Sequence, residues 1–177
     1  MSFRSGTCGF LLRIGLFAGV AGAQSGSVWI DVPFVGQEKN GCGAAAIAML
    51  MRYWGREDVD PHRIQQELYS EDAHGIRGAD IQRYLRENGF RTFVFQGEWP
   101  DLEEHLARVR PLLVSLHAGH GGSLHYVVVS GVDAAQNLVL VNDPARAKLL
   151  KIERGAFEKD WSAAGRWTLL AIPQPSR

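Results

Sequence analysis

One cysteine stands where a helix is expected to begin. Cys42 lies between Gly41 and Gly43, and an alanine-rich run follows it. The glycines leave the sulfur sterically open, and the alanines propagate a helix well. The positive end of that helix dipole stabilises a thiolate relative to a thiol, which makes a cysteine nucleophilic. The alternative is that Cys42 is a small buried apolar residue at a crowded helix start, so its candidate partners decide between the two.

A nucleophilic cysteine needs an imidazole that takes its proton and later protonates the leaving amine. The chain has six histidines. Five of them have ordinary solvated positions on predicted exposed helix faces, a linker or a loop: His62, His74, His105, His117 and His120. His125 differs because it opens an apolar strand predicted at 124–132, where the sheet holds a polar side chain near solvent. We therefore predict His125 as the partner of Cys42.

The imidazole in turn needs an acceptor that fixes its orientation. The strand at 124–132 and the strand after it are predicted to form a hairpin, and pairing across its turn places the residue opposite His125 at 143–145. Asp143 falls in this range, while the competing acceptor Asn142 falls on the other face of the sheet. A simple turn start is the alternative role for Asp143, which precedes a proline.

The attacked carbonyl of an acyl-transfer reaction develops negative charge, which requires hydrogen-bond donors fixed before the reaction. Gln37 stands five positions before Cys42 and can offer its side-chain amide beside the Cys42 backbone N–H. A surface glutamine in a polar loop is the alternative. The predicted catalytic set is thus Cys42, His125, Asp143 and Gln37.

The elements that must position these side chains separate along the chain. Helical patterns dominate the first part, at about 43–53, 61–69, 79–88 and 100–109, with a short helix later at 155–161. Strand patterns dominate after Pro111, at 112–116, 124–132, 138–142, 148–152 and 167–172, with an earlier strand at 91–95. This order predicts an α+β fold, in which a helical part that carries the cysteine packs on an antiparallel sheet.

Composition limits the chain to one globular domain and restricts its partners. The 177 residues are 46% hydrophobic and 21% charged, with a formal net charge of zero. This suits a single core and gives no electrostatic footprint for nucleic acid. The sequence lacks the glycine-rich loop that binds nucleotide phosphates and the cysteine or histidine pairs of structural zinc sites. We expect a peptide or protein substrate, and no nucleic acid, nucleotide, metal or organic cofactor.

Residues 1–23 have the pattern of a secretory signal. Basic residues precede an apolar stretch at 14–20, and Ala21-Gly22-Ala23 supplies the small side chains that signal peptidase reads. We expect cleavage before Gln24, which would export one domain of residues 24–177 to the periplasm or the extracellular space. An uncleaved short anchor is the alternative, and it would be the only membrane contact of the chain.

Export bears on the number of cysteines. Cys8 would leave with the signal, so Cys42 would remain alone and could not form an internal disulfide in an oxidising compartment. A lone retained thiol favours a catalytic role for Cys42.

The segments that carry this chemistry resemble those of a known family. They are Gln37, Cys42-Gly43-Ala44-Ala45, Met49, Tyr53-Trp54-Gly55, His125-Tyr126-Val127-Val128-Val129 and Asn142-Asp143-Pro144-Ala145. Together they resemble the papain-like bacteriocin-processing (double-glycine leader) cysteine peptidases, over about residues 30–172. The resemblance implies a papain-like fold and peptide-bond hydrolysis. It implies Cys42 as the nucleophile and His125 as general base and acid. It implies Asp143 as the residue that orients the imidazole and Gln37 as an oxyanion donor.

Two departures from that family shape the expectation. The best-known members are N-terminal domains of ABC exporters, whereas this chain looks like a stand-alone secreted relative. Many members also carry an acidic residue directly before the cysteine, where this chain has Gly41. We therefore expect an exported cysteine peptidase, carry over the chemistry of the family, and leave open whether cleavage follows a Gly-Gly pair. A thiol acyltransferase or transglutaminase-like enzyme is one alternative, and a catalytically silent peptide-binding module is another.

Overall fold

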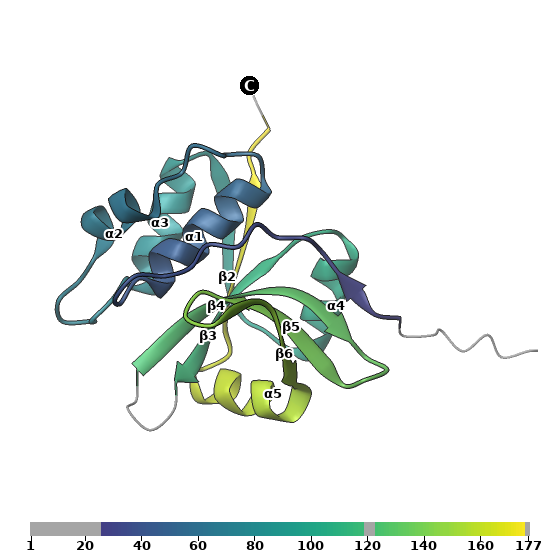
Figure 1. Cartoon of the computed structure of the whole chain (residues 1–177). Coiled ribbons are helices and arrows are strands. Elements are labelled where there is room, and N and C mark those ends of the chain that lie inside the picture. The colour runs from purple at the N-terminus through teal and green to yellow at the C-terminus, as the bar shows by residue number, and fades with distance from the viewer. Residues whose placement is uncertain (1–25, 119–122, 176–177) are drawn as a thin grey trace, which may run out of the picture.

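A seven-stranded antiparallel sheet runs through the middle of the protein, as seen in a computed structural model that describes residues 26–118 and 123–175 (Figure 1). The strands are β1 Val28–Trp29, β2 Phe90–Gln96, β3 Leu112–Ala118, β4 Ser123–Asp133, β5 Leu138–Asp143, β6 Ala147–Glu153 and β7 Trp167–Pro173. Their order across the sheet is β2-β7-β3-β4-β5-β6, and β1 pairs with β4. The expected signal segment, with Cys8, and the loop histidine His120 lie outside the described residues.

The described part of the chain has five helices. They are α1 Cys42–Tyr53, α2 Pro61–Leu68, α3 Gly78–Glu87, α4 Trp99–Ala107 and α5 Arg154–Ala163. Four of these helices pack on the sheet, and α2 packs on α1. Figure 1 shows α1, α2 and α3 together on one side of the sheet and α5 on the opposite side. The α+β fold predicted from the sequence is confirmed, and every predicted helix and strand overlaps an observed element to within two residues at each end.

The sheet draws on both halves of the chain. β2, which follows the first three helices, pairs with the last strand β7 from Phe90↔Pro173 to Gln96↔Trp167. The sequence predicted this strand but gave it no partner, because strand patterns do not specify pairing between distant segments. The β2–β7 pair therefore fastens the helical part to the sheet.

Helix α1 is the central helix because it is apolar around its whole circumference. Every residue from Gly43 to Met51 is buried, and a helix with this pattern must lie inside the protein. Its end is fixed by Gly55, whose φ of 83° suits a glycine beyond a helix terminus, and by the Trp54 side chain, whose Nε1 donates to the Ala171 carbonyl at 3.1 Å. Cys42, the first residue of α1, is thus carried by the most deeply buried helix of the fold.

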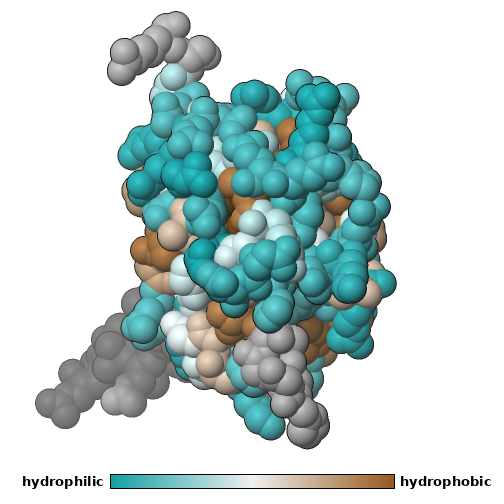
Figure 2. Space-filling model, turned by 90° about the vertical axis from the view of Figure 1, so that its left-hand side faces the viewer, coloured by the Kyte–Doolittle hydropathy of each residue, from teal (hydrophilic) through white to brown (hydrophobic). Residues whose placement is uncertain are grey.

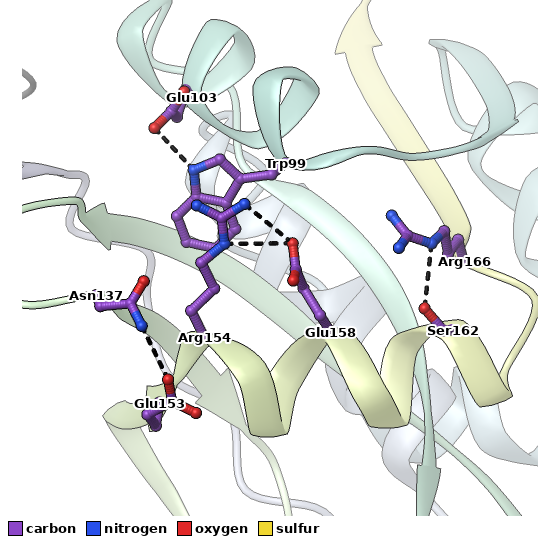
Figure 3. A network of polar contacts seen from close by, with 8 residues as sticks. All are labelled: Trp99, Glu103, Asn137, Glu153, Arg154, Glu158, Ser162 and Arg166. Atoms are coloured by element: carbon purple, nitrogen blue, oxygen red, sulfur yellow. Dashed lines mark hydrogen bonds and ion pairs between the residues drawn. The ribbon is translucent and has the colours of Figure 1, made fainter.

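Helix α5 lies on the opposite side of the sheet from α1 and takes part in a network of polar contacts (Figure 3). The Arg154 guanidinium lies 4.1 Å from the centroid of the Trp99 ring and bonds to Glu158 Oε1 at 3.3 Å. The contact between Arg154 and Trp99 links α5 to α4, and within α4 the Trp99 Nε1 donates to Glu103 at 2.8 Å. Because α5 also packs on β3, this network fixes the helix that walls one side of the site described below.

The surface seen in Figure 2 is mainly hydrophilic, and its hydrophobic residues gather in a few patches between hydrophilic ones. The large apolar side chains that remain exposed are Trp29, Phe34, Phe93, Val94, Val109 and Leu124. Within the described residues, no helix combines the length and the apolar composition needed to cross a membrane.

Candidate active site

Cys42 lies at the exposed end of a buried helix. The residue before it, Gly41, occupies the N-cap position and has no side chain to bond the first-turn N–H groups. Among these groups, the Gly43 N–H helps to lower the pKa of Cys42, as expected for an anion at a helix N-terminus. The next residue, Gly43, packs against Ile76 so closely that an added Cβ would lie 3.0 Å from the Ile76 Cβ. The absence of a side chain at Gly43 therefore lets the first turn of α1 reach its position.

His125 connects the thiol to the carboxylate. It lies near the start of β4, where it pairs with Leu116 of β3, and its Nε2 lies 2.7 Å from Asp143 Oδ1. The same imidazole is hydrogen-bonded to the Cys42 side chain, so Nδ1 is the nitrogen left to face the sulfur. The side chains of His125 and Asp143 are only 18% and 7% exposed. The structure thus brings together the three side chains that the sequence put forward.

Asp143 reaches His125 because of the β4–β5 register. Val128 pairs with Asn142 and Val129 with Val141, so continuing the ladder puts the residue opposite His125 within the predicted range. Asp143 ends β5, and its Oδ1 also accepts a hydrogen bond from the Ala145 N–H at 2.9 Å. This second hydrogen bond helps to fix the orientation of the Asp143 carboxylate.

Asn142, the competing acceptor, has a different task. Its side chain is fully buried, donates to the Val32 carbonyl at 3.0 Å and accepts from the Leu149 N–H at 3.0 Å. Both ends of the amide are occupied by backbone groups. Asn142 therefore holds the strands together and leaves His125 to Asp143.

The electrostatics of the three groups favour an ion pair between thiolate and imidazolium. Burial opposes the charged form of Cys42, but the hydrogen bond from His125, the backbone N–H of Tyr126 and the positive charge of His125 outweigh it and lower the pKa of Cys42. Burial likewise opposes the charged form of His125, yet its hydrogen bonds with Asp143 and Cys42 and their negative charges raise the pKa of His125 to about 9. Burial would raise the pKa of Asp143, but its hydrogen bond with His125 lowers it. These shifts favour a thiolate on Cys42 beside a protonated His125.

Gln37 lies where the two halves of the site meet. Its backbone N–H donates to the Pro144 carbonyl at 2.9 Å, so the loop before Cys42 is tied to the turn after Asp143. Its side-chain Oε1 is buried and has no hydrogen-bond partner among the described residues. The end of the side chain is therefore partly enclosed, although the residue as a whole is only half-buried.

A groove of about 640 Å³ opens beside His125 and Asp143. Its walls come from β3, β6, the turn after β5 and α5, through residues that include Leu116, His117, Arg146, Lys151, Glu153 and Asp160. Both signs of charge line it. Within the described ranges, no group of three or more His, Cys, Asp or Glu side chains could hold a metal ion.

Two histidines differ from the sequence prediction. His117 was predicted in a loop, but it belongs to β3 and lines the groove, because the strand continues two residues past the apolar run that defined it. His105 was predicted on an exposed face, yet it is partly buried beside the Phe95 ring, 6.0 Å between centroids, and this burial lowers the pKa of His105. A longer strand pattern could have placed His117, whereas the packing of His105 on Phe95 depends on tertiary structure.

A nucleophile on a helix N-terminus, an imidazole and carboxylate on an adjoining antiparallel sheet, and a glutamine ahead of the nucleophile define the papain-like class of thiol enzymes. Within that class, the Peptidase C39-like family model matches residues 29–169. The match extends over most of the chain, and the chain belongs to this family. The family prediction made from the sequence is confirmed.

Relatives of known function are larger proteins. The chain is 28% identical over 142 residues to the lactococcin-G-processing and transport ATP-binding protein LagD of Lactococcus lactis. It is 27% identical over 128 residues to the pediocin PA-1 transport/processing ATP-binding protein PedD of Pediococcus acidilactici. These matches cover 78% and 71% of this chain but only 18% and 17% of the relatives. The chain thus spans less than a fifth of the length of the curated relatives it matches.

Solved structures share the fold over almost their full length. The peptidase domain of Streptococcus ComA superimposes with a TM-score of 0.67 at 21% identity, covering 81% of this chain and 100% of that domain. A putative C39-like peptidase from Bacillus anthracis gives 0.65 at 18% identity, covering 85% and 99%. A double glycine motif protease in complex with its leader peptide gives 0.64 at 20% identity, covering 85% and 96%. The chain therefore has the fold of C39 peptidase domains, and its family and fold together support a cysteine peptidase-type function.

Proposed function

We propose that this protein is an exported cysteine endopeptidase that hydrolyses peptide bonds with Cys42 as nucleophile, His125 as general acid and base, and Asp143 as the residue that orients the imidazole. The observation that carries the proposal is the arrangement around His125. Its Nε2 lies 2.7 Å from Asp143 Oδ1, and the same ring is hydrogen-bonded to a cysteine at a helix N-terminus. A cysteine, an imidazole and a carboxylate in this arrangement are the groups that covalent acyl transfer needs.

In the first half of the reaction, the Cys42 thiolate attacks the carbonyl carbon of the peptide bond, and the carbonyl electron pair moves to oxygen. The tetrahedral intermediate collapses as the C–N bond breaks, and the His125 imidazolium gives its Nδ1 proton to the departing amine. A thioester between Cys42 and the acyl part of the substrate remains. The imidazole is then neutral and can act as a base.

In the second half, His125 takes a proton from water while the water oxygen attacks the thioester carbonyl. The C–S bond breaks, the acid product leaves, and Cys42 returns to the thiolate beside a protonated His125. Asp143 keeps the ring directed and stabilises its positive charge in both halves, without itself taking the proton.

We assign two hydrogen-bond donors to the oxyanion of each tetrahedral intermediate: the side-chain amide of Gln37 and the backbone N–H of Cys42. The bond from the Gln37 N–H to the Pro144 carbonyl supports this assignment, because it holds Gln37 against the turn that follows Asp143. Removing one preorganised donor of this kind lowers turnover about 10²- to 10³-fold.

The substrate is assigned as a peptide or protein segment. One structural neighbour was solved with a bound leader peptide, and a groove lies next to His125 and Asp143. Export rests on the basic, apolar and small-residue pattern of residues 1–23. With this pattern, the processed domain would act outside the cytoplasm on exported proteins.

The test compares the wild type with Cys42→Ala. We expect alkylation of residue 42 by iodoacetamide and all peptide hydrolysis to be lost in Cys42→Ala, while circular dichroism and the unfolding midpoint stay those of a folded protein. Peptide mapping by mass spectrometry separates labelling at Cys42 from labelling at Cys8. Exported proteins cleaved by the wild type and not by the variant identify the substrate, and full activity of Cys42→Ala would overturn the proposal.

Two further readouts distinguish other uses of the same site. Transfer of the acyl group to an added amine in place of water would assign the protein to thiol acyltransferases. A Cys42 that fails to react with iodoacetamide at neutral pH would indicate a peptide-binding module.

A further inference from the structure

The groove of about 640 Å³ beside His125 lies where the leaving part of a substrate has to pass. In the proposed reaction His125 gives its proton to the departing amine, so the segment that begins with this amine starts next to the imidazole ring. The described residues that line the groove include His125 and Asp143. They do not include Cys42 or Gln37, which are assigned to the acyl carbon and the oxyanion. The groove therefore matches the segment on the C-terminal side of the broken bond.

The charged side chains of the groove, apart from the pair of Asp143 and His125, differ in how far they are already engaged. They are Arg146, Lys151, Glu153 and Asp160. Glu153 accepts a hydrogen bond from Asn137 Nδ2 at 2.9 Å (Figure 3) and another from the Ala156 N–H at 3.0 Å. Among the described residues, the ion pairs include none of the other three. These three charges are thus available to a ligand.

The available charges lie on different walls of the groove. Arg146 belongs to the turn after Asp143, and its backbone N–H donates to the Asp143 carbonyl at 2.9 Å. Asp160 belongs to α5. Lys151 pairs with Leu140, three residues before Asp143 on β5, which puts its backbone roughly 10 Å along the strands from the Asp143 end. Arg146 is therefore the cation nearest to the candidate catalytic residues.

The charge of Arg146 acts on these residues but has no carboxylate of its own. Burial raises the pKa of Asp143, the hydrogen bond with His125 lowers it, and the positive charge of Arg146 lowers it further. Asp143 is already paired with the His125 imidazole at 2.7 Å. A guanidinium binds a carboxylate through two parallel N–H···O hydrogen bonds, so a substrate carboxylate is the ligand that suits Arg146.

We propose that the groove binds the segment released as the amine product, and that Arg146 selects an acidic side chain among the first two residues of this segment. The inference rests on the proposed function, because it assigns the groove to the leaving part of a peptide. The substrate is then a peptide or protein with Asp or Glu just after the cleaved bond. Arg146 determines specificity and takes no part in bond breaking.

The test runs the second half of the reaction with an amine that competes with water. p-Nitrophenyl acetate acetylates Cys42, as the C–O bond to p-nitrophenolate breaks and a thioester forms. The amine nitrogen of a dipeptide amide then attacks the thioester carbonyl, the C–S bond breaks, and His125 takes the amine proton. This step is the reverse of amine departure, so the acceptor occupies the place of the leaving segment. In a peptidase this transfer accompanies hydrolysis and does not replace it.

Two pairs of acceptors isolate the effect of charge: Ala-Asp-amide with Ala-Asn-amide, and Asp-Ala-amide with Asn-Ala-amide. The C-terminal amides avoid a second carboxylate, and about pH 8 leaves much of the α-amino group neutral. Mass spectrometry gives the ratio of N-acetyl dipeptide amide to acetate, and the value for Cys42→Ala is subtracted as background. For the wild type we expect the acidic member of at least one pair to be favoured about three- to fivefold, the range of an exposed ion pair. This preference should shrink in about 1 M NaCl.

Three variants separate selection by Arg146 from a general effect of charge. In Arg146→Gln the acidic and neutral acceptors should react alike, and in Arg146→Glu the acidic acceptor should become the poorer one. Lys148→Gln is the matched control, because it also removes one positive charge from this part of the chain. Lys148 pairs with Asp31 at 2.6 Å and is not among the described residues that line the groove. Its variant should keep the preference of the wild type.

The outcomes distinguish this inference from the proposed function. The assignment of Arg146 would be overturned by a wild type without the acidic preference or without any transfer to the acceptors. A preference that survives in both Arg146 variants, or that is lost equally in Lys148→Gln, would also overturn it. Each of these results leaves the peptidase proposal intact. A wild type whose Cys42 is not acetylated would contradict the proposed function, and the inference with it.

Discussion

The two halves of the candidate site are positioned by different forces. Cys42 is placed by packing: α1 is buried from Gly43 to Met51, and its N-terminus is limited by the contact between Gly43 and Ile76. His125 and Asp143 are placed by hydrogen bonds, first through the antiparallel ladders of β4 and then through the bonds that Asp143 makes with His125 and Ala145.

This difference predicts different responses to mutation. Packing is nondirectional, so a change on the helix side should alter stability and shift the sulfur by small steps. Hydrogen bonds are directional, so removing a bond that His125 or Asp143 makes should leave the fold in place and misdirect the imidazole. The following experiments test this distinction.

The largest effect is expected from Asp143→Ala. It removes the acceptor 2.7 Å from His125 Nε2, so the ring loses both its orientation and the support for its positive charge. We expect kcat/KM for a cleaved peptide to fall about 10²- to 10⁴-fold, with a free energy of unfolding close to that of the wild type.

The adjacent residue supplies the contrast. Asn142→Ala removes the buried amide that joins the Val32 carbonyl to the Leu149 N–H, so we expect a loss of roughly 1–3 kcal/mol in unfolding free energy. The fraction that remains folded should turn over at a rate near that of the wild type. The distinction fails if Asp143→Ala is mainly a stability mutant or if folded Asn142→Ala is inactive.

The position of Cys42 could be predicted from a local sequence pattern, whereas the contact between His125 and Asp143 required a further inference about strand pairing. An apolar run with glycines at both ends is a local pattern, and it placed α1 to within one residue. The link between His125 and Asp143 required pairing across a hairpin. The pairs nearest the turn, such as Val132 with Val139, would place residue 146 opposite His125. The bulge between Val129 and Gly131 moves this position to 145, which lies inside the predicted range.

Several features could not be read from the sequence for physical reasons. The pairing of β2 with β7 and the packing of His105 on Phe95 join segments far apart in the chain, and no local pattern encodes them. The small pocket that Gln37 and Gln65 line depends on how α2 lies against the loop before Cys42. Gln37 itself was put forward by its position before Cys42.

The pH dependence tests the coupling between the two halves. Since the pKa of Cys42 is lowered and that of His125 is raised to about 9, the ion pair exists between the two values. Peptide hydrolysis should therefore fall below the Cys42 pKa, where the thiolate is protonated, and again above about pH 9, where His125 loses the proton it must give to the amine. Alkylation by iodoacetamide should fall only on the acid side, because a thiolate needs no proton donor to displace iodide.

Asp143→Asn sharpens the pH experiment. The hydrogen bond with Asp143 and its negative charge both raise the pKa of His125, so a neutral amide should move the alkaline limb of hydrolysis to lower pH. The profiles of hydrolysis and alkylation are measured on the same preparations. An alkaline limb that does not move in Asp143→Asn would show that another group controls it.

The smallest effect is expected from Gly43→Ala, which tests the packing side. An added Cβ would lie 3.0 Å from the Ile76 Cβ and 3.5 Å from two further Ile76 atoms, so Ile76 or the helix must shift. Crowding of this kind costs about 1–3 kcal/mol, and the better helix propensity of alanine returns up to about 1 kcal/mol. We expect a net loss of roughly 1 kcal/mol in the unfolding free energy measured by chemical denaturation, and a several-fold change in the rate of Cys42 alkylation.

Gly36→Ala is the control, because its nearest neighbour would be a Phe34 ring atom at 4.0 Å, and its unfolding free energy should stay within about 0.5 kcal/mol of the wild type. If Gly43→Ala leaves both stability and alkylation unchanged, the contact with Ile76 does not set the position of the sulfur, and the helix dipole and the bond to His125 must hold it instead.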